Sequence, residues 1–345
     1  MATATASASL SAFPAGITSS SQCTLETCPL TYAHLTYLPN AAGNGLLLAI
    51  FGLLIPAQIY MGIRYRTWGF MAGMFCGLVL EVFGYVGRLK MIDNPFTDKW
   101  FAMYIVCLTI APAFLSAAIY ISLARIVAVY TVKLSRFSQR WYGIIFVIWD
   151  VVSLLLQAAG GGLATSNDES TLETAKRVMM AGLSTQVISL SIYLGLCIDF
   201  AWRIRRLKRT NANSFDNRNL EMTNKQGNTP QQFSSSENLA GNIVLLNPNF
   251  AALRASKRWL TFLVLQGLAT ICIYIRSIFR LAELHGGFRS SLANDQVTFM
   301  VLEGAMIVIA ALGLSTWGHP GVGFYGKWQV LDYRLFVKKP HTSGV

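Results

Sequence analysis

The chain has 345 residues, of which 53% are hydrophobic and only 13% are charged. An average soluble protein carries roughly 25% charged residues, so this chain lacks the charged coat that a soluble domain of its size needs. The net charge of +12 would favour nucleic-acid binding in a polar protein, but the apolar composition argues against that class and indicates an integral membrane protein.

Seven runs of mostly apolar residues are long enough to cross a bilayer as helices, which takes about 20 residues. They cover roughly residues 43–63, 69–87, 100–123, 142–163, 178–201, 260–281 and 298–317. Trp and Tyr stand at several of their ends, as is typical of amphipathic rings at the headgroup level. The sequence therefore predicts an all-α fold, a seven-transmembrane helix bundle in a multi-pass membrane protein.

The Lys and Arg residues are distributed unevenly over the segments between these spans. The segment before residue 43 has none, whereas the loop 203–258 and the C-terminal tail are rich in them. Because basic residues accumulate on the cytoplasmic side, the pattern predicts an N-terminus outside and a cytoplasmic C-terminus. The odd number of spans agrees with this orientation.

The pattern divides the chain into three regions: an exterior N-terminal tail, residues 1–42; the membrane domain, 43–317; and a cytoplasmic tail, 318–345. The one long loop, 203–258, is rich in Asn, Gln, Ser and Thr in its middle, which indicates disorder. Its basic start, 203–209, either recruits anionic lipid of the inner leaflet or only fixes the topology, and the second interpretation is favoured.

Two of the six cysteines lie in the exterior tail. Cys23 and Cys28 stand in Cys-Thr-Leu-Glu-Thr-Cys, where a local disulfide is plausible outside the cell. The alternative is two free thiols. The other four cysteines fall within spans, where we expect small apolar packing residues.

The sequence argues against a metal enzyme and an ATP-driven pump. His34 and His285 are predicted outside, while His319 and His341 are predicted inside, so a three-histidine zinc site cannot form. There is no Gly-rich phosphate loop and no Gly-x-Ser-x-Gly elbow. We therefore expect no metal, no cofactor and no hydrolase activity.

Polar side chains within the spans are the strongest functional signal, because a charge at the membrane centre costs about 2.5–3.5 kcal/mol on insertion scales. In spans two, four and six they recur at helical spacing, so each set shares one face. The candidates for a ligand site are Glu81, Tyr85 and Arg88 in the second span, Asp150 and Gln157 in the fourth, Gln186 in the fifth, Arg276, Arg280 and Glu283 in the sixth, and Glu303 in the seventh.

With the predicted orientation, most of these residues lie at middle to outer depth, and Asp150 lies deeper. The three glutamates among them balance the three arginines, as a low-dielectric setting demands. We interpret the set as a polar cavity open toward the outer leaflet, in which carboxylates suit an amine and arginines suit a phosphate. The alternative is a structural network that joins the helices.

Pro112 lies in the middle of the third span, in Ala-Pro-Ala-Phe. Proline removes one backbone hydrogen bond from a helix and kinks it. Pro112 is therefore a candidate hinge, although a static kink is the favoured interpretation.

Several motifs occur in a specific order along the chain. They include Tyr37-Leu-Pro-Asn40, Glu81-Val-Phe-Gly-Tyr-Val-Gly-Arg88, Ala111-Pro-Ala-Phe114, Ile275-Arg-Ser-Ile-Phe-Arg280 and His319-Pro-Gly321. Together they resemble the fungal RTA-like proteins, also called the lipid-translocating exporter family. Two positions depart from that pattern: Asn294-Asp-Gln296 stands where the family usually has His-Glu, and Glu303 where it usually has Asp.

The resemblance implies a fungal multi-span protein, often of the plasma membrane, linked to the efflux or flipping of sphingoid long-chain bases and to resistance against toxic amphiphiles. One branch is linked to porphyrin handling. The leading hypothesis is thus a transporter or translocase of amphipathic lipids, with membrane lipids and amphipathic small molecules as partners and no specified oligomeric state. The runner-up is a seven-helix lipid receptor or sensor that regulates a stress response.

Overall fold

The computed structural model describes residues 23–30, 33, 35, 37–130, 139–163, 169–225, 250–286, 295–326 and 328. The regular elements in these ranges are all helical, and no strand occurs there. In chain order they are α1 (Ala41–Arg64), α2 (Trp68–Asp93), α3 (Asp98–Tyr130), α4 (Gln139–Leu163), α5 (Glu169–Lys225), α7 (Ala251–Ala255), α8 (Lys257–Gly286), α9 (Gln296–Phe299), the π-helix η5 (Met300–Ala305), α10 (Met306–Ser315) and α11 (Pro320–Gly323).

Seven helical segments of the described chain are long and apolar enough to cross a membrane. Each overlaps one of the predicted spans, so the prediction of an all-α fold with seven spans is confirmed. The seventh span is composite, because α9, η5 and α10 follow one another without a break. Many outward side chains are apolar: Leu53 on α1, for example, is 73% exposed, as expected for a surface that faces hydrocarbon.

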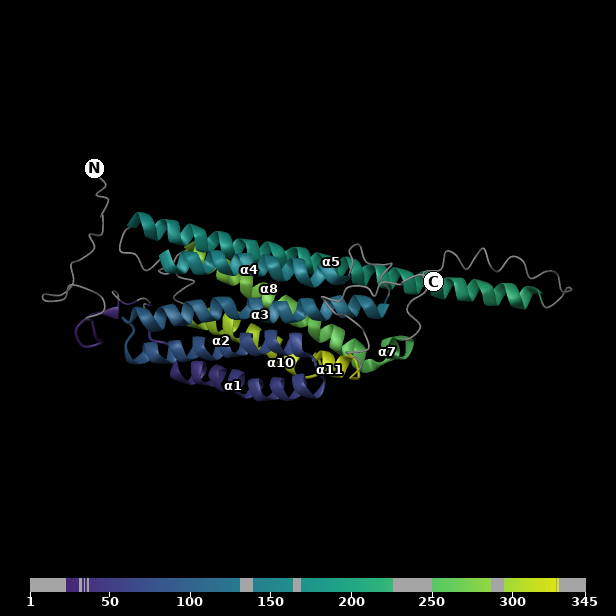
Figure 1. Cartoon of the computed structure of the whole chain (residues 1–345), viewed down its shortest axis with the longest axis horizontal. Helices are drawn as coiled ribbons and strands as arrows, with labels where there is room; N and C mark the ends of the chain where they lie inside the picture. The colour runs from purple at the N-terminus through teal and green to yellow at the C-terminus, as the bar shows by residue number, and fades with distance from the viewer. Residues whose placement is uncertain are drawn as a thin grey trace, which may run out of the picture.

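α2 packs closely against α3 because glycines line one face of α2. A Cβ atom added at Gly73 would lie 3.0 Å from the Phe114 carbonyl oxygen, and one at Gly87 would lie 3.1 Å from the Trp100 carbonyl oxygen. Small residues let helix backbones approach closely in membrane proteins. The linkers 65–67 between α1 and α2 and 94–97 between α2 and α3 are both short, so α1, α2 and α3 run as antiparallel neighbours (Figure 1).

Figure 1 shows α4 and α5 side by side along one side of the bundle and α1 along the opposite side, with α2, α3 and α8 between them. α8 contacts α10, α5 and α3. It therefore joins the two sides, and its polar face lies inside the bundle.

Residues 23–30 lie at one end of the bundle. Cys23 and Cys28 are joined by a disulfide, and they form a small buried cluster with Phe96 from the α2–α3 connection. Asn40 caps α1, because its side chain accepts a hydrogen bond of 3.0 Å from the Gly43 backbone N–H. The segment before α1 and the α2–α3 connection thus lie at the same end, which we call the tail end.

The seventh span begins with a cap of its own. The Asp295 carboxylate accepts hydrogen bonds from the Thr298 hydroxyl and from the Val297 backbone N–H, the latter at 3.1 Å. These bonds favour the ionised form and hold the pKa of Asp295 below its usual value, the Thr298 hydroxyl contributing most. The residue that departs from the RTA-like pattern here is therefore a helix cap.

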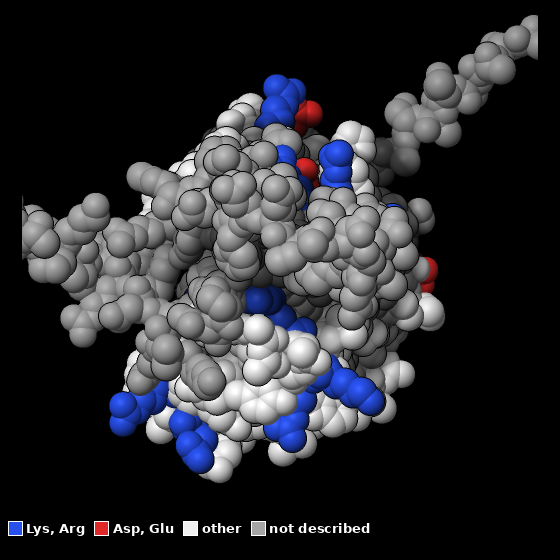
Figure 2. Space-filling view, turned by 90° about the vertical axis from the view of Figure 1, so that its right-hand side faces the viewer, with Lys and Arg blue, Asp and Glu red and all other residues white. Residues whose placement is uncertain are grey.

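The opposite end of the bundle is basic. α1 ends at Arg64, α7 carries Arg254, and α8 begins with Lys257 and Arg258. Figure 2 views this end, where Lys and Arg side chains gather and few acidic side chains are visible. We call it the basic end. Its charge matches the pattern from which the sequence predicts a cytoplasmic location.

Part of the expected C-terminal tail belongs to the bundle. The Phe324 ring lies 5.0 Å from the Trp259 ring and 5.3 Å from the Trp328 ring, measured between centroids. The Arg125 guanidinium lies 3.8 Å from the centre of the Trp328 ring and donates a hydrogen bond to the carbonyl oxygen of that residue. The core therefore continues past residue 317, because these rings cover the start of α8.

The structure also differs from the predicted disordered loop. α5 continues as a helix to Lys225 and projects from the basic end (Figure 1). The sequence explains this extension: the stretch 203–225 contains neither Gly nor Pro, and the first such residue is Gly227. Arg203 and Asp199 form an i, i+4 ion pair of 2.9 Å within the same helix. The predicted disordered middle of the loop, 210–237, is thus helical as far as Lys225, and residues 226–249 lie outside the described residues.

Candidate functional site

Two buried ions on neighbouring helices form the centre of the site. Arg276 on α8 and Glu303 in η5 are each 1% exposed, and Nη2 of the arginine donates to Oε1 of the glutamate at 2.7 Å. Arg280, one turn further along α8, approaches the same oxygen with its Nε at 3.6 Å. Breaking a buried pair by removing one partner costs about 3–5 kcal/mol, so each of these residues stabilises the others.

Pro112 supplies a further partner for Arg276. Because proline has no backbone N–H, the carbonyl oxygen four residues earlier, on Leu108, loses its helical donor. Arg276 Nη2 donates a hydrogen bond to this Leu108 oxygen. α3 itself runs without interruption through Pro112. The proline thus creates an acceptor that binds α3 to α8, and its role as a hinge stays a prediction.

The backbone around Glu303 is irregular. This residue lies in η5, the six-residue π-helix Met300–Ala305, and single π-helical turns occur frequently at functional sites. The neighbouring Gly304 lies close to α1 and α2: a Cβ atom there would be 2.7 Å from Leu47 Cδ1 and 3.2 Å from the Tyr85 hydroxyl. The last span therefore needs a glycine at this level in order to bring Glu303 to the arginines.

A second ion pair lies toward the tail end. Arg280 Nη1 donates to Glu283 Oε2 at 2.5 Å, and Arg280 Nη2 donates to the Thr109 hydroxyl at 3.4 Å. The guanidinium carbon of Arg280 also lies 5.8 Å from the centre of the Tyr104 ring. Arg88 lies 4.8 Å from the centre of the same ring. Tyr104 thus contacts both arginines.

Arg88 is held mainly by aromatic faces. Its guanidinium carbon lies 3.7 Å from the centre of the Phe299 ring, and Nη2 donates to the Tyr37 hydroxyl at 2.9 Å. Its Nε and Nη1 have no hydrogen-bond partner within the part of the chain that the structure describes. Cation–π contacts therefore stabilise this buried charge, and two donors stay available.

Glu81 and Tyr85 add unused hydrogen-bonding groups. Glu81 is 1% exposed and interacts electrostatically with Arg276, Glu303 and Arg280. Its Oε1 and the Tyr85 hydroxyl have no hydrogen-bond partner among the residues described here. The network is therefore close to charge balance but retains free polar atoms.

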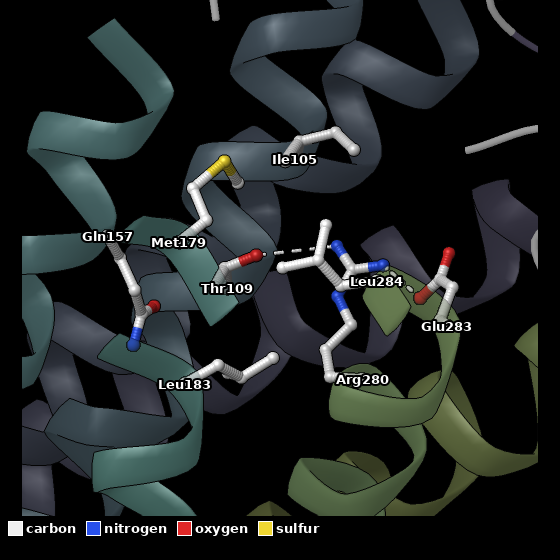
Figure 3. A pocket seen from close by; sticks show the side chains of 8 residues that line it. All are labelled: Ile105, Thr109, Gln157, Met179, Leu183, Arg280, Glu283 and Leu284. Atoms are coloured by element: carbon white, nitrogen blue, oxygen red, sulfur yellow. Dashed lines mark hydrogen bonds and ion pairs between the residues drawn. The ribbon is translucent and has the colours of Figure 1, made fainter. Parts of the chain in front are cut away.

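A pocket lies beside this network, between α3, α4, α5 and α8 (Figure 3). Its cavity volume is about 20 Å³, which holds about one water molecule, so a larger ligand group needs the lining side chains to move apart. Its polar lining residues are Thr109, Gln157, Arg280 and Glu283, and its apolar lining residues are Ile105, Met179, Leu183 and Leu284. Figure 3 shows Arg280 reaching toward Thr109, with Gln157 across the pocket.

Two of the predicted residues lie away from the ion pairs. Gln186 accepts a hydrogen bond of 3.2 Å from Gln157 Nε2 and so supports the pocket wall from α5. Asp150 lies seven residues before Gln157 on α4, which is about 10 Å along a helix. Its carboxylate accepts a hydrogen bond of 2.9 Å from the Ser116 hydroxyl. Asp150 therefore belongs to a separate polar cluster.

Sequence reasoning missed Tyr37, Tyr104, Thr109 and Phe299. Tyr37 opens a motif that carries the family resemblance, so a signal for it was present. Thr109 and the two aromatic rings gave none, because hydroxyl and aromatic residues are common in membrane spans. Their contact with the arginines depends on which helices are neighbours.

These features define a seven-helix membrane protein with a buried ion-pair network beside an amphipathic pocket at one end of the bundle. No solved structure matches the chain. The sequence model of the family described as RTA1-like protein matches residues 74–327, which is most of the chain. The chain belongs to this family, so the predicted resemblance is confirmed.

Relatives in Saccharomyces cerevisiae cover most or part of the chain. The sphingoid long-chain base transporter RSB1 is 31% identical over 299 residues, which is 84% of this chain and 74% of the relative. Protein RTM1 is 27% identical over 262 residues, or 74% of this chain and 71% of the relative. Protoporphyrin uptake protein 1 is 34% identical over 133 residues, or 38% and 43%. The similarity to RSB1 supports a family of lipid transporters.

Proposed function

We propose that the protein moves amphipathic lipids across the membrane and that a sphingoid long-chain base is its substrate. The observation that carries this proposal is the pocket, whose lining combines four polar and four apolar residues. A sphingoid base has one amine, two hydroxyls and a long chain. The Glu283 carboxylate suits the amine, Thr109 and Gln157 suit the hydroxyls, and the apolar lining residues suit the chain.

The ion pair within the pocket explains how an amine enters it. Within the pocket, Glu283 is neutralised by Arg280 at 2.5 Å. An ammonium group that approaches Glu283 competes with Arg280, which retains Glu303 as a second carboxylate at 3.6 Å. After the exchange each of the two carboxylates still faces a cation, with Glu303 shared by Arg276 and Arg280, and the amine adds one positive charge to the network.

The same proposal includes location and orientation. We place the tail end outside and the basic end in the cytoplasm of a plasma-membrane protein that confers resistance to toxic amphiphiles. The basic residues at the start of α8 and in 203–209 support this orientation, and 203–209 would contact anionic lipid of the inner leaflet. The orientation is tested by placing a tag at either terminus of the protein and measuring its access to protease in intact cells.

Transbilayer movement can be tested with purified protein. The wild-type chain is reconstituted into liposomes, and the movement of a fluorescent long-chain base is compared with that of an analogue in which a hydroxyl replaces the amine. Glu283→Gln removes the pocket carboxylate. Glu173→Gln is the matched control, because Glu173 forms an exposed pair with Arg177 on α5, with both side chains at least 76% exposed.

The wild-type protein is expected to accelerate movement of the amine-bearing lipid more than that of the analogue. Glu283→Gln should reduce this preference at least tenfold, and Glu173→Gln should leave it unchanged. A pure protein that accelerates neither lipid overturns the transport proposal. An unchanged preference in a folded Glu283→Gln variant overturns the assignment of the pocket.

A further inference from the structure

A second polar cluster, separate from the pocket, lies between α3, α4 and α5. Asp150 on α4 is 3% exposed, and its Oδ2 accepts a hydrogen bond of 2.9 Å from the Ser116 hydroxyl on α3. The hydroxyls of Tyr120 on α3 and Ser189 on α5 lie beside the same carboxylate. Both side chains are at least 98% buried. Oxygen atoms from three helices thus converge on one point.

Several of these oxygens lack a partner. Asp150 Oδ1, the Tyr120 hydroxyl and the Ser189 hydroxyl make no hydrogen bond of regular geometry to any residue described by the structure, although both hydroxyls lie close enough to interact with the carboxylate. Buried polar groups are nearly always paired, with protein atoms or with a bound species. One carboxylate oxygen and two hydroxyl oxygens without a regular hydrogen bond therefore indicate a ligand of their own.

The charge of Asp150 is also unbalanced. No Lys, Arg or His within the described ranges forms an ion pair with it. The titratable groups that face the cluster are Tyr120 from α3, and Tyr193 and Cys197 from α5, none of which carries a positive charge. An ionised carboxylate without a counter-charge is heavily penalised inside a membrane protein. The positive charge must therefore come from outside the chain.

The surroundings limit the size of that ligand. The rings of Tyr120, Phe146 and Tyr193 pack together with centroid distances of 4.7 to 5.4 Å. Phe146 lies one turn from Asp150 on α4, and Tyr193 lies one turn from Ser189 on α5. These close-packed rings adjoin the oxygen cluster and leave it suited to a single small ion rather than a lipid headgroup.

We propose that Asp150, together with Ser116, Ser189 and Tyr120, binds one small monovalent cation from solution, either a proton or a sodium ion. An all-oxygen ligand set suits a hard cation, and a single carboxylate balances one positive charge. This site is independent of the lipid pocket and of the function proposed for it.

The test measures the melting temperature, Tm, of the purified full-length protein in detergent micelles. NaCl is compared with choline chloride at equal ionic strength, and the series is repeated between pH 5.5 and 8.5. Asp150→Asn removes the charge and keeps the shape of the side chain. Asp199→Asn is the control, because it removes a partly exposed carboxylate from α5.

Sodium binding predicts a saturable rise of the wild-type Tm by roughly 3 °C or more in NaCl. Proton binding predicts a Tm that depends on pH and not on sodium. In either case the response is lost in Asp150→Asn and retained in Asp199→Asn. A wild-type protein without either response, or a folded Asp150→Asn variant that responds as the wild type does, overturns the proposal.

A second variant keeps the proposal testable if Asp150→Asn does not fold. Ser189→Ala removes one proposed ligand oxygen and leaves the carboxylate in place. It should raise the half-saturating sodium concentration several-fold or shift the midpoint of the pH response. Unchanged midpoints in both titrations would count against the site.

Discussion

The Arg276→Met substitution is expected to leave two buried groups without a strong partner. The Glu303 carboxylate would retain only the Nε atom of Arg280, at 3.6 Å. The Leu108 carbonyl oxygen would have no donor at all, because Pro112 provides no N–H. In a Pro112→Ala background the Leu108 oxygen regains its helical donor, so Arg276→Met then strands only the carboxylate.

The two substitutions should therefore be coupled. Loss of a buried ion-pair partner costs about 3–5 kcal/mol, and a stranded carbonyl adds about 1–3 kcal/mol. Hydrogen bonds between membrane helices average about 0.6 and reach about 1.7 kcal/mol. We expect the double variant to be more stable than the sum of the single effects by about 1–2 kcal/mol.

The wild type, the two single variants and the double variant are unfolded in mixed detergent micelles at increasing dodecyl sulfate concentration. Helicity is measured by circular dichroism. Pro56→Ala provides the matched control, because Pro56 lies within α1 and is exposed. In the double-mutant cycle of Pro56→Ala and Arg276→Met, the changes in unfolding free energy should be additive. If the Pro112 cycle is also additive within about 0.3–0.5 kcal/mol, the link between the proline and the arginine is wrong.

Three further predictions concern the seventh span and its neighbours. Gly304→Ala should cost about 1–3 kcal/mol in the same unfolding assay, because its Cβ would lie 2.7 Å from a leucine of α1. Gly267→Ala is the control, because no atom lies within 4 Å of the added Cβ, and it should be neutral or stabilising. Glu303→Asp keeps the charge and should cost less than Glu303→Gln, for which we expect about 3–5 kcal/mol; equal costs would show that the charge facing Arg276 is unimportant. The pKa of Asp295 is lowered in the folded protein, so this carboxylate stabilises the fold above its unfolded pKa of about 3.9. That stability is lost as the pH falls through the lower folded pKa. The Tm of Asp295→Ala should therefore fall less than that of the wild type between pH 5 and 3.

Side-chain spacing predicted much of the network. Arg276, Arg280 and Glu283 recur at intervals of four and three residues, so they share one face of any helix that contains them. In the structure that face is buried, and the two arginines converge on Glu303. Hydropathy likewise predicted the seven spans, because a bilayer imposes length and composition on each span separately.

Spacing within a helix says nothing about which helices are neighbours. The sequence grouped Asp150 with the other polar residues because of its helix face, yet α4 carries it toward Ser116 and away from the arginines. The sequence also provided no indication of the π-helix, because a π-helix changes the backbone without requiring an unusual residue type. The extended α5 was missed because polar composition was weighed above the absence of Gly and Pro.

The polar cavity and the structural network, which the sequence offered as alternatives, fall on different residues. Arg276 and Glu303 are buried and do not line the pocket, while Arg280 and Glu283 do. An unpaired backbone group at membrane depth is tolerated only where protein or a cavity surrounds it, and the Leu108 carbonyl that Pro112 frees meets this condition because Arg276 donates to it. The inner ion pair therefore fixes α3, α8 and the seventh span relative to one another. This fixed frame leaves the outer pair, Arg280 and Glu283, as the part whose partners a ligand can exchange.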